Sequence, residues 1–317
     1  MPVRVVEGVV QHYDWGDTEF IPKLLGLAGR GKPWAELWLG THPNGPTLLD
    51  DGTPLAELTG ELTYLLKVLS AAEPLSMQCH PNVEQALDGF ERGVYPDANA
   101  KPELLVALTE FEALCGLRPA DHVISELAGS QLASAVQDHG TAGAFEQIYR
   151  GTLDAEAIVF RFERSSDPRA TLIDRLVEQG DVVSAAASLL LNHVVLQPGE
   201  AIHLTAGNVH AYLHGSGVEL MGASDNVVRA GMTTKHVDVD ELLRIFDREP
   251  LANPVMDVVD GRYPLPEAGV VLVRLDPGAT HRSTGHELAI ALDGTTLYLS
   301  PGTQIYADSE TFVVTTD

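Results

Sequence analysis

The 317-residue chain has few cysteines, few basic residues and no long apolar run, and each shortage excludes a class of protein. Two cysteines, Cys79 and Cys115, cannot build a disulfide framework, and the N-terminus lacks the apolar core of a secretory signal. We therefore expect a cytoplasmic protein. Because 20 Lys and Arg face 45 Asp and Glu, the formal charge of −25 argues against nucleic acid and anionic membranes as partners. No apolar stretch is long enough to span a bilayer.

What is present is the composition of an ordinary globular protein of two or three structural units. Short apolar runs such as 63–69 and 104–108, bounded by turn residues, predict a mainly β chain. Asn82, followed by helix formers, is expected to cap a short helix. Apolar residues recur at helical spacing in only one long stretch, which predicts a helical insertion. We expect a first β domain from residues 1–118 and 192–249, the helical insertion at 119–191, and a second, smaller β domain at 250–317.

Gln78 and His80 are the first pair of side chains with metal-binding potential. On a strand they project to the same side, whereas Cys79 projects to the other side and is expected to be a packed thiol. Alone, a Gln-x-His pair is usually polar strand surface. Support comes from Pro198 through Tyr212, which resembles the second cupin motif in having a glycine, a turn and then a histidine, His210. Small β-barrels bring distant strands together around one ligand-binding mouth.

Beyond that motif, the chain resembles type I mannose-6-phosphate isomerases over most of residues 13–240. The matching stretches, in the order of the family, are Tyr13-Asp14-Trp15-Gly16, Ala35 through Pro43, Leu66-Lys67-Val68-Leu69-Ser70, Pro74 through Asn82, Lys101-Pro102-Glu103, Phe111 through Pro119, and Gly207 through Lys235. The resemblance fades in the helical insertion and in the C-terminal unit. It implies a cupin-type β-barrel or jelly-roll catalytic domain, the helical domain, and a smaller cupin-like β domain.

The resemblance also implies one zinc ion per chain. The residues that match the zinc ligands of the family are Gln78, His80, Glu103 and His210. Two imidazole nitrogens and two oxygens suit a divalent ion that is left partly open for substrate.

The implied reaction interconverts mannose 6-phosphate and fructose 6-phosphate by moving a proton between C1 and C2 through an enediol. Arg229 is the expected electrostatic partner of negative charge on this hexose phosphate. The base must lie within hydrogen-bond reach of the transferred proton. The candidates are Glu219, Lys101 and Lys235, with Asp225 in an orienting or secondary acid/base role, and the sequence does not rank them.

Three positions depart from the pattern of the family. Ala100 stands where a histidine commonly precedes Lys-Pro-Glu, Thr205 replaces the usual proline of the cupin turn, and Thr233-Thr234-Lys235 replaces Thr-Pro-Lys. These changes spare the four ligands but remove any proton relay that uses the missing histidine.

Two other functions remain open at this point. One is a cupin oxygenase or epimerase that uses iron or manganese, because ligand types alone do not fix the metal. The other is a non-catalytic, metal-containing sugar-binding module, for which Ala100 is the motivating observation. We expect a monomer, with an oligomer as the open alternative.

Overall fold

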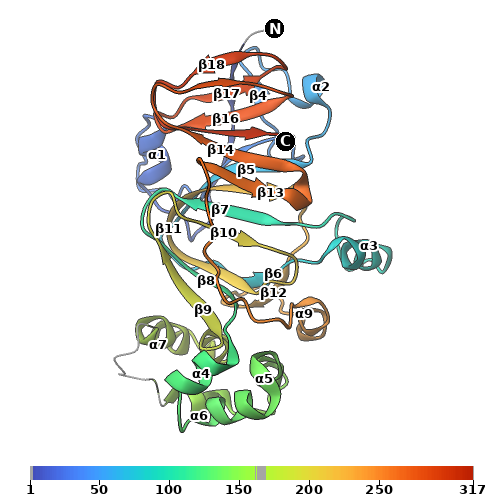
Figure 1. The fold of residues 1–317 in the computed structure, drawn as a ribbon, viewed down its shortest axis with the longest axis vertical. Helices are drawn as coiled ribbons and strands as arrows, with labels where there is room; N and C mark the ends of the chain where they lie inside the picture. The colour runs from blue at the N-terminus through green and yellow to red at the C-terminus, as the bar shows by residue number, and fades with distance from the viewer. Residues whose placement is uncertain (1–2, 161, 163–168, 317) are drawn as a thin grey trace.

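The computed structural model describes residues 3–160, 162 and 169–316. Figure 1 shows three tiers along the longest axis: a sheet containing the C-terminal strands, a larger sheet in the middle, and a group of helices at the opposite end. The chain is rich in strands, and one continuous helical stretch interrupts them. The predicted mainly β fold with a helical insertion is therefore confirmed.

The middle tier is a ten-stranded antiparallel sheet built around β11, a 13-residue strand. The strands of this sheet are, in order, β10 (Ala201–Leu204), β7 (Glu103–Ala107), β11 (His210–Gly222), β5 (Tyr64–Ala71), β3 (Glu36–Leu39) and β2 (Val9–Gln11), with β6 (Met77–Cys79), β12 (Val228–Gly231), β8 (Phe111–Leu117) and β9 (Leu191–Leu196) off this path. The C-terminal part of β11 pairs with β5 and β7, and its N-terminal residues pair with β6 and β8. Among the described residues the pairing does not close into a ring, so the cupin-like sheets form an open arrangement rather than a complete barrel.

The two faces of this sheet have opposite chemistry because side chains alternate along a strand. On one face, the rows Leu66–Leu220–Leu104 and Val68–Val218–Val106 run across β5, β11 and β7 and pack against the C-terminal sheet. On the other face, Lys67 lies opposite Glu219, and Glu103 lies opposite Met221. The apolar face joins the two tiers, which leaves the charged face free to build a site.

The upper tier is a seven-stranded antiparallel sheet that includes two N-terminal strands. Its strands, in order, are β13 (Arg262–Leu265), β14 (Val270–Leu275), β19 (Thr311–Thr315), β16 (Glu287–Ala291), β17 (Thr296–Leu299), β1 (Arg4–Glu7) and β4 (Leu48–Leu49). A short pair, β15 (Thr280–Arg282) and β18 (Gln304–Tyr306), accompanies it. Because β1 pairs with β17, the two ends of the chain meet in one sheet, and both termini lie at this end of Figure 1. The division into three domains at 118, 191 and 249 remains a prediction.

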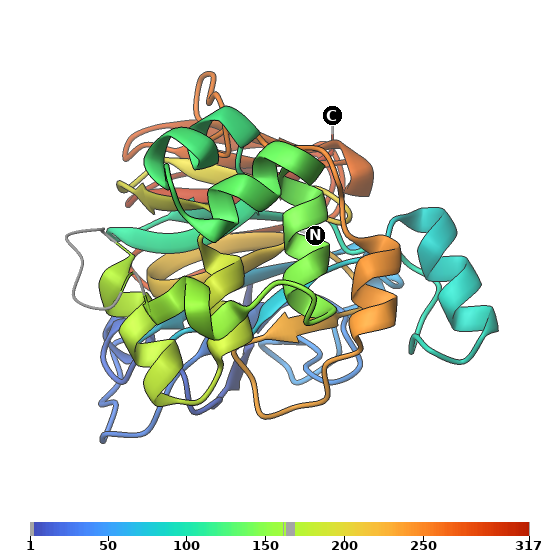
Figure 2. The ribbon, with the colours of Figure 1, turned by 90° about the horizontal axis from the view of Figure 1, so that it is seen from below.

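The helical insertion closes the other end of the middle tier, as the view from below in Figure 2 shows. It consists of α4 (Ala120–Glu126), α5 (Gln131–Tyr149), α6 (Ala155–Phe160), α7 (Ala170–Glu178) and α8 (Val182–Ser188). Its buried side chains form one core with residues of β6, β8, β11 and β12, so the helices are anchored next to the strands that carry the predicted ligands. No helix in the described ranges is both long and apolar enough to cross a membrane.

The remaining helices are short and connect strands. They are α1 (Phe20–Leu24), α2 (Ala56–Thr59), α3 (Val83–Glu91), α9 (Val239–Ile245) and the 3-10 turn η1 (Pro266–Ala268). The predicted cap of α3 is confirmed: the Gln85 amide donates to Asn82 Oδ1 at 2.8 Å, and the Asn82 amide donates to Gln85 Oε1 at 2.9 Å.

Candidate metal centre and active site

Three of the four predicted ligands meet in the buried interior of the middle tier. The ligand atoms of His80, Glu103 and His210 all lie within 4.8 Å of one another. Gln78 lies opposite His210 in the register of β6 and β11, and the Gln78 Nε2 and His210 Nε2 atoms are 3.5 Å apart. The predicted convergence of residues from three separate parts of the chain is thus present.

The turn before β11 explains how His210 reaches His80. The Gly207 amide donates to the His80 carbonyl at 2.8 Å, which fastens the turn to the end of β6. Gly207 has a φ of +77°, and a Cβ there would lie 2.7 Å from the Asp247 nitrogen. Glycine is therefore required by conformation and by space. The glycine in the cupin-like motif is what lets the loop approach closely enough to deliver the histidine.

Each histidine is oriented by a backbone carbonyl. His80 Nδ1 lies 2.7 Å from the Asn226 oxygen, and His210 Nδ1 lies 2.9 Å from the Asn208 oxygen. Since a carbonyl can only accept, each Nδ1 carries the proton and each Nε2 keeps its lone pair. Burial lowers the pKa of His80 to about 4, so this ring is neutral at neutral pH, as a metal ligand must be.

The carboxylate of Glu103 lies between the two rings. Its oxygens are 3.3 Å from His80 Nε2 and 3.3 Å from His210 Nε2, and Lys101 Nζ lies 2.8 Å from Glu103 Oε1. Burial opposes ionisation of Glu103, but the Lys101 ammonium and the contacts with His80 and His210 together outweigh it and hold the pKa of this carboxyl well below its usual range. Glu103 is therefore an anionic donor at neutral pH.

These residues fit a divalent cation by a direct structural criterion. His80 Nε2 and Glu103 Oε2 are buried, and neither has a hydrogen-bond partner among the described residues. A buried polar atom without a partner costs about 1–3 kcal/mol, and here two of them belong to the same cluster of ligand atoms. Two imidazole nitrogens and a carboxylate form a donor set that zinc accepts. One cation between them would satisfy both atoms.

A second charged cluster adjoins the centre, and the sequence analysis assigned a role only to its Glu219. Lys67 Nζ lies 3.3 Å from Glu36 Oε1 and 3.1 Å from Glu219 Oε2, and it sits over the ring of Trp38. Burial would lower the pKa of Lys67, but the two carboxylates raise it above its usual value, and burial raises the pKa of Glu219. The available signal was a single charge inside the apolar strand run 64–69, which is unusual for a buried strand.

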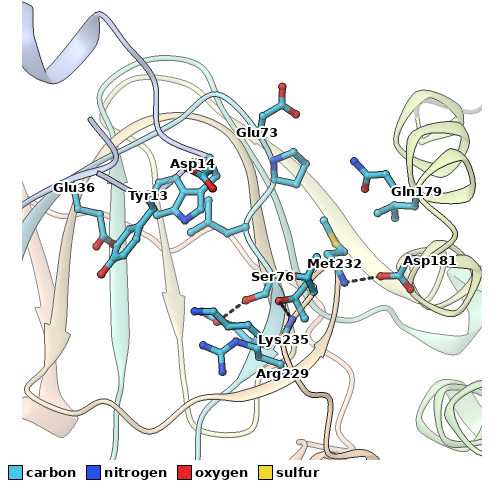
Figure 3. Close-up of a pocket in the computed structure, with 17 residues that line it drawn as sticks. Tyr13, Asp14, Glu36, Glu73, Ser76, Gln179, Asp181, Arg229, Met232 and Lys235 are labelled. Carbon is cyan, nitrogen blue, oxygen red and sulfur yellow. Dashed lines mark hydrogen bonds between the residues drawn. The ribbon is translucent and has the colours of Figure 1, made fainter. Parts of the chain in front are cut away.

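A cavity of about 920 Å³ opens beside the metal centre. Figure 3 shows walls from the N-terminal loop with Tyr13, the segment with Glu73 and Ser76, the helical insertion with Gln179, and the segment that carries Arg229 and Lys235. Gln78 also lines it.

The predicted catalytic residues lie in three places. Arg229 and Lys235 line the cavity, and Arg229 lies opposite Gln78 in the pairing of β12 with β6. Lys101 and Glu219 are buried behind it, beside the metal centre. Asp225 is exposed, and its carboxylate lies 3.3 Å from His42 Nε2. Four of the five are therefore in the cavity or beside the ligands.

The open cupin-like sheets and the mixed nitrogen and oxygen donors define the class: a metalloprotein of the cupin type. Comparisons with known proteins then narrow the class. A model of the family described as phosphomannose isomerase type I, catalytic domain, matches residues 53–120. A mannose-6-phosphate isomerase of Ogataea parapolymorpha is 33% identical over 369 aligned positions, covering 93% of this chain and 86% of that protein. The enzyme of the same name from Salmonella typhimurium is 35% identical and covers 81% of this chain and 79% of its own length.

Solved structures give the same result. The apo mannose 6-phosphate isomerase of Salmonella typhimurium superimposes with a TM-score of 0.80 at 27% identity, covering 100% of this chain and 97% of that one. A mannose 6-phosphate isomerase bound with zinc and yttrium gives a TM-score of 0.79 at 27% identity with the same coverage. The chain belongs to the type I mannose-6-phosphate isomerase family.

Proposed function

We propose that this chain is a zinc-dependent aldose–ketose isomerase that interconverts mannose 6-phosphate and fructose 6-phosphate. The observation that carries the proposal is the buried convergence of His80, Glu103 and His210, with two orphaned donor atoms, beside a cavity that contains two cationic side chains. We infer the reaction from membership of the isomerase family.

Zinc would be held by Gln78, His80, Glu103 and His210, one ion per chain. Bound there, it supplies Lewis-acid polarisation and a template for the carbonyl and hydroxyl oxygens of the opened sugar. The Asn208 and Asn226 carbonyls keep both Nε2 atoms available, and the Lys101 ammonium favours the ionised form of Glu103.

The two cations in the cavity have separate tasks in this proposal. Because the net charge of −25 repels an anionic substrate at long range, a phosphate must be captured by local cations. Arg229 neighbours Gln78 by strand register, so it suits the charge that develops on the enediolate. Lys235 is exposed and lies near the hydroxyls of Thr233 and Ser76 in the same cavity wall, so it suits the phosphate.

We assign the proton transfer to the buried candidates, Glu219 and Lys101. Both lie beside the metal centre, whereas Asp225 is exposed and engaged by His42 and Asn44. Lys67 holds Glu219 at 3.1 Å and fixes its position. Asp225 then keeps the orienting role rather than the role of the base.

The proposal also includes a cytoplasmic monomer. Both cysteines are free and fully buried, which agrees with a reducing compartment.

The test measures metal content and then the conversion of mannose 6-phosphate to fructose 6-phosphate before and after chelation. Stoichiometric zinc and chelator-sensitive turnover support the isomerase. Metal without turnover would support the sugar-binding module, and oxygen uptake would support the oxygenase; either result contradicts the proposal. Glu219→Gln and Lys101→Met, assayed in the same way, identify the proton-transfer group by loss of kcat with zinc retained.

A further inference from the structure

Asp97 lies in the loop between α3 and β7, outside the residues that line the cavity, and the mechanism above does not use it. Four donors nevertheless converge on its carboxylate. Ser224 Oγ donates at 2.9 Å, the Asp225 amide at 2.9 Å, the Asn226 side-chain amide at 3.2 Å and the Asn99 amide at 2.9 Å. An ionised carboxylate has acceptor sites for all four. Asp97 therefore fixes the turn 224–226.

That turn is closed by its own hydrogen bonds, and its first and third residues are buried. The Asn226 amide donates to Ser224 Oγ at 3.1 Å, and Asn226 Nδ2 also donates to the backbone oxygens of Asp97 and Asn99, at 2.9 and 2.8 Å. Ser224 is 2% exposed and Asn226 is 0% exposed. Because the Ser224 and Asn226 side chains are held by several hydrogen bonds in a buried position, the turn can take another position only by losing these bonds together.

The network ends at His80, one of the proposed metal ligands. The Asn226 backbone oxygen is the acceptor for His80 Nδ1, at 2.7 Å, and so it sets both the tautomer and the direction of the ring. On its other side, the network holds the Asn99 carbonyl, two residues before Lys101 and four before Glu103. One carboxylate thus ties the acceptor of His80 to the loop that enters β7.

We propose that Asp97 is a positioning residue for the metal centre. Through the turn 224–226 it places the Asn226 carbonyl so that His80 presents Nε2 toward Glu103. This inference depends on the proposed zinc site, and it adds a residue that neither contacts the cavity nor binds the metal.

The test replaces Asp97 with Asn, which puts amide hydrogens where the donors of Ser224 and Asp225 point. Partners one step outside a metal ligand typically contribute about 10–100-fold to metal affinity or activity. Asp97 acts one step further out, so we expect the dissociation constant for zinc, measured by competition with a chromophoric chelator, to rise about tenfold. At saturating zinc, kcat should fall while KM for the sugar phosphate stays within twofold. The visible spectrum of the cobalt-substituted protein should also change, because the ligand field reports the ring position.

The matched control is Asp88→Asn. Asp88 is an exposed carboxylate on α3 that pairs with Arg92 and Arg244 and makes no described contact with the turn 224–226. Its zinc affinity and cobalt spectrum should equal those of the wild type. Ser224→Ala, which deletes one hydroxyl from the network, is the second probe if Asp97→Asn does not fold, and its zinc affinity should fall about threefold.

The inference is overturned if zinc affinity and the cobalt spectrum of Asp97→Asn, or of Ser224→Ala in its place, match those of Asp88→Asn. That outcome requires a wild type that binds zinc. A wild type without zinc would instead refute the proposed function, so the two failures are distinguishable.

Discussion

Two buried carboxylates, Glu103 in the middle tier and Glu287 in the upper tier, have similar surroundings but differ in how far the protein satisfies their hydrogen bonds. Each begins a strand, each is at most 2% exposed, and each faces histidine. Glu287 accepts from His281 Nε2 at 2.6 Å, from Thr315 Oγ1 at 2.7 Å and from the Thr284 amide at 2.9 Å. Glu103 faces two Nε2 atoms at 3.3 Å, and its Oε2 has no hydrogen-bond partner among the described residues.

The difference shows what marks a metal site in a structure of the protein alone. A buried carboxylate next to histidine is common to both places, so burial and residue type do not discriminate between them. At Glu287 the protein completes the hydrogen bonds by itself, which makes the cluster structural. At Glu103 the protein leaves His80 Nε2 and Glu103 Oε2 without partners among ligand atoms that lie within 4.8 Å of one another, and one cation would satisfy them together.

The largest expected effect comes from Glu103→Ala. Removing a direct ligand must exceed the roughly 10–100-fold effect typical of outer partners, so kcat/KM should fall by more than about a hundredfold, and bound zinc should be lost with it. Metal analysis and turnover of the same preparation check this. If the variant keeps both zinc and activity, Glu103 leaves the ligand set and the contrast with Glu287 disappears.

Glu287→Ala should produce the converse result. Its loss leaves the hydroxyls and the amide that it accepted from without a buried partner, so we expect the free energy of unfolding to fall by about 2–3 kcal/mol. Zinc content and kcat at 25 °C should be unchanged. Denaturant unfolding with metal analysis tests both statements, and a Glu287 variant that loses zinc would show that the two tiers are coupled.

The pH dependence of stability sharpens the same comparison on a smaller scale. Burial opposes ionisation of Glu287, but hydrogen bonds from His281, Thr315 and Thr284 outweigh it and lower its pKa in the folded state. A lowered folded pKa gives stability that is complete above the unfolded pKa of about 4.3 and is lost as pH falls through the folded pKa. In metal-free protein, the gap in unfolding free energy between wild type and Glu287→Gln should therefore be constant just above pH 5 and shrink toward pH 3.5. A gap that widens on acidification would contradict the assignment.

Much of the site was predictable from sequence because its residues interrupt strong local patterns. Gln78 and His80 share a strand face by simple alternation, Gly207 marks the turn that delivers His210, and Asn82 caps α3 as expected. The fold class followed from the spacing of apolar residues and from family resemblance.

The missed features depend on pairing between distant strands. The sequence does not show that β1 would pair with β17 and join the two ends of the chain. Nor does it show that Lys67 would lie opposite Glu219. Such contacts are set by sheet register, which the local sequence leaves open until the whole fold is fixed.

The smallest effect is expected at the rim of the cavity, where the helical insertion meets the sheet. Arg175 of α7 lies 3.2 Å from Glu73, which lines the cavity, and both side chains are partly or largely exposed. Because water screens such a pair, exposed ion pairs contribute about 0.2–1 kcal/mol, and much of that is offset by the ordering of two long side chains. Arg175→Ala should change the free energy of unfolding by less than about 1 kcal/mol and KM by less than about twofold, with zinc affinity unaffected, as steady-state kinetics and unfolding can measure. A larger rise in KM at constant kcat would mean that the insertion holds the sugar phosphate, and the functional contrast would then lie between the sheet, which positions the metal, and the helices, which position the substrate.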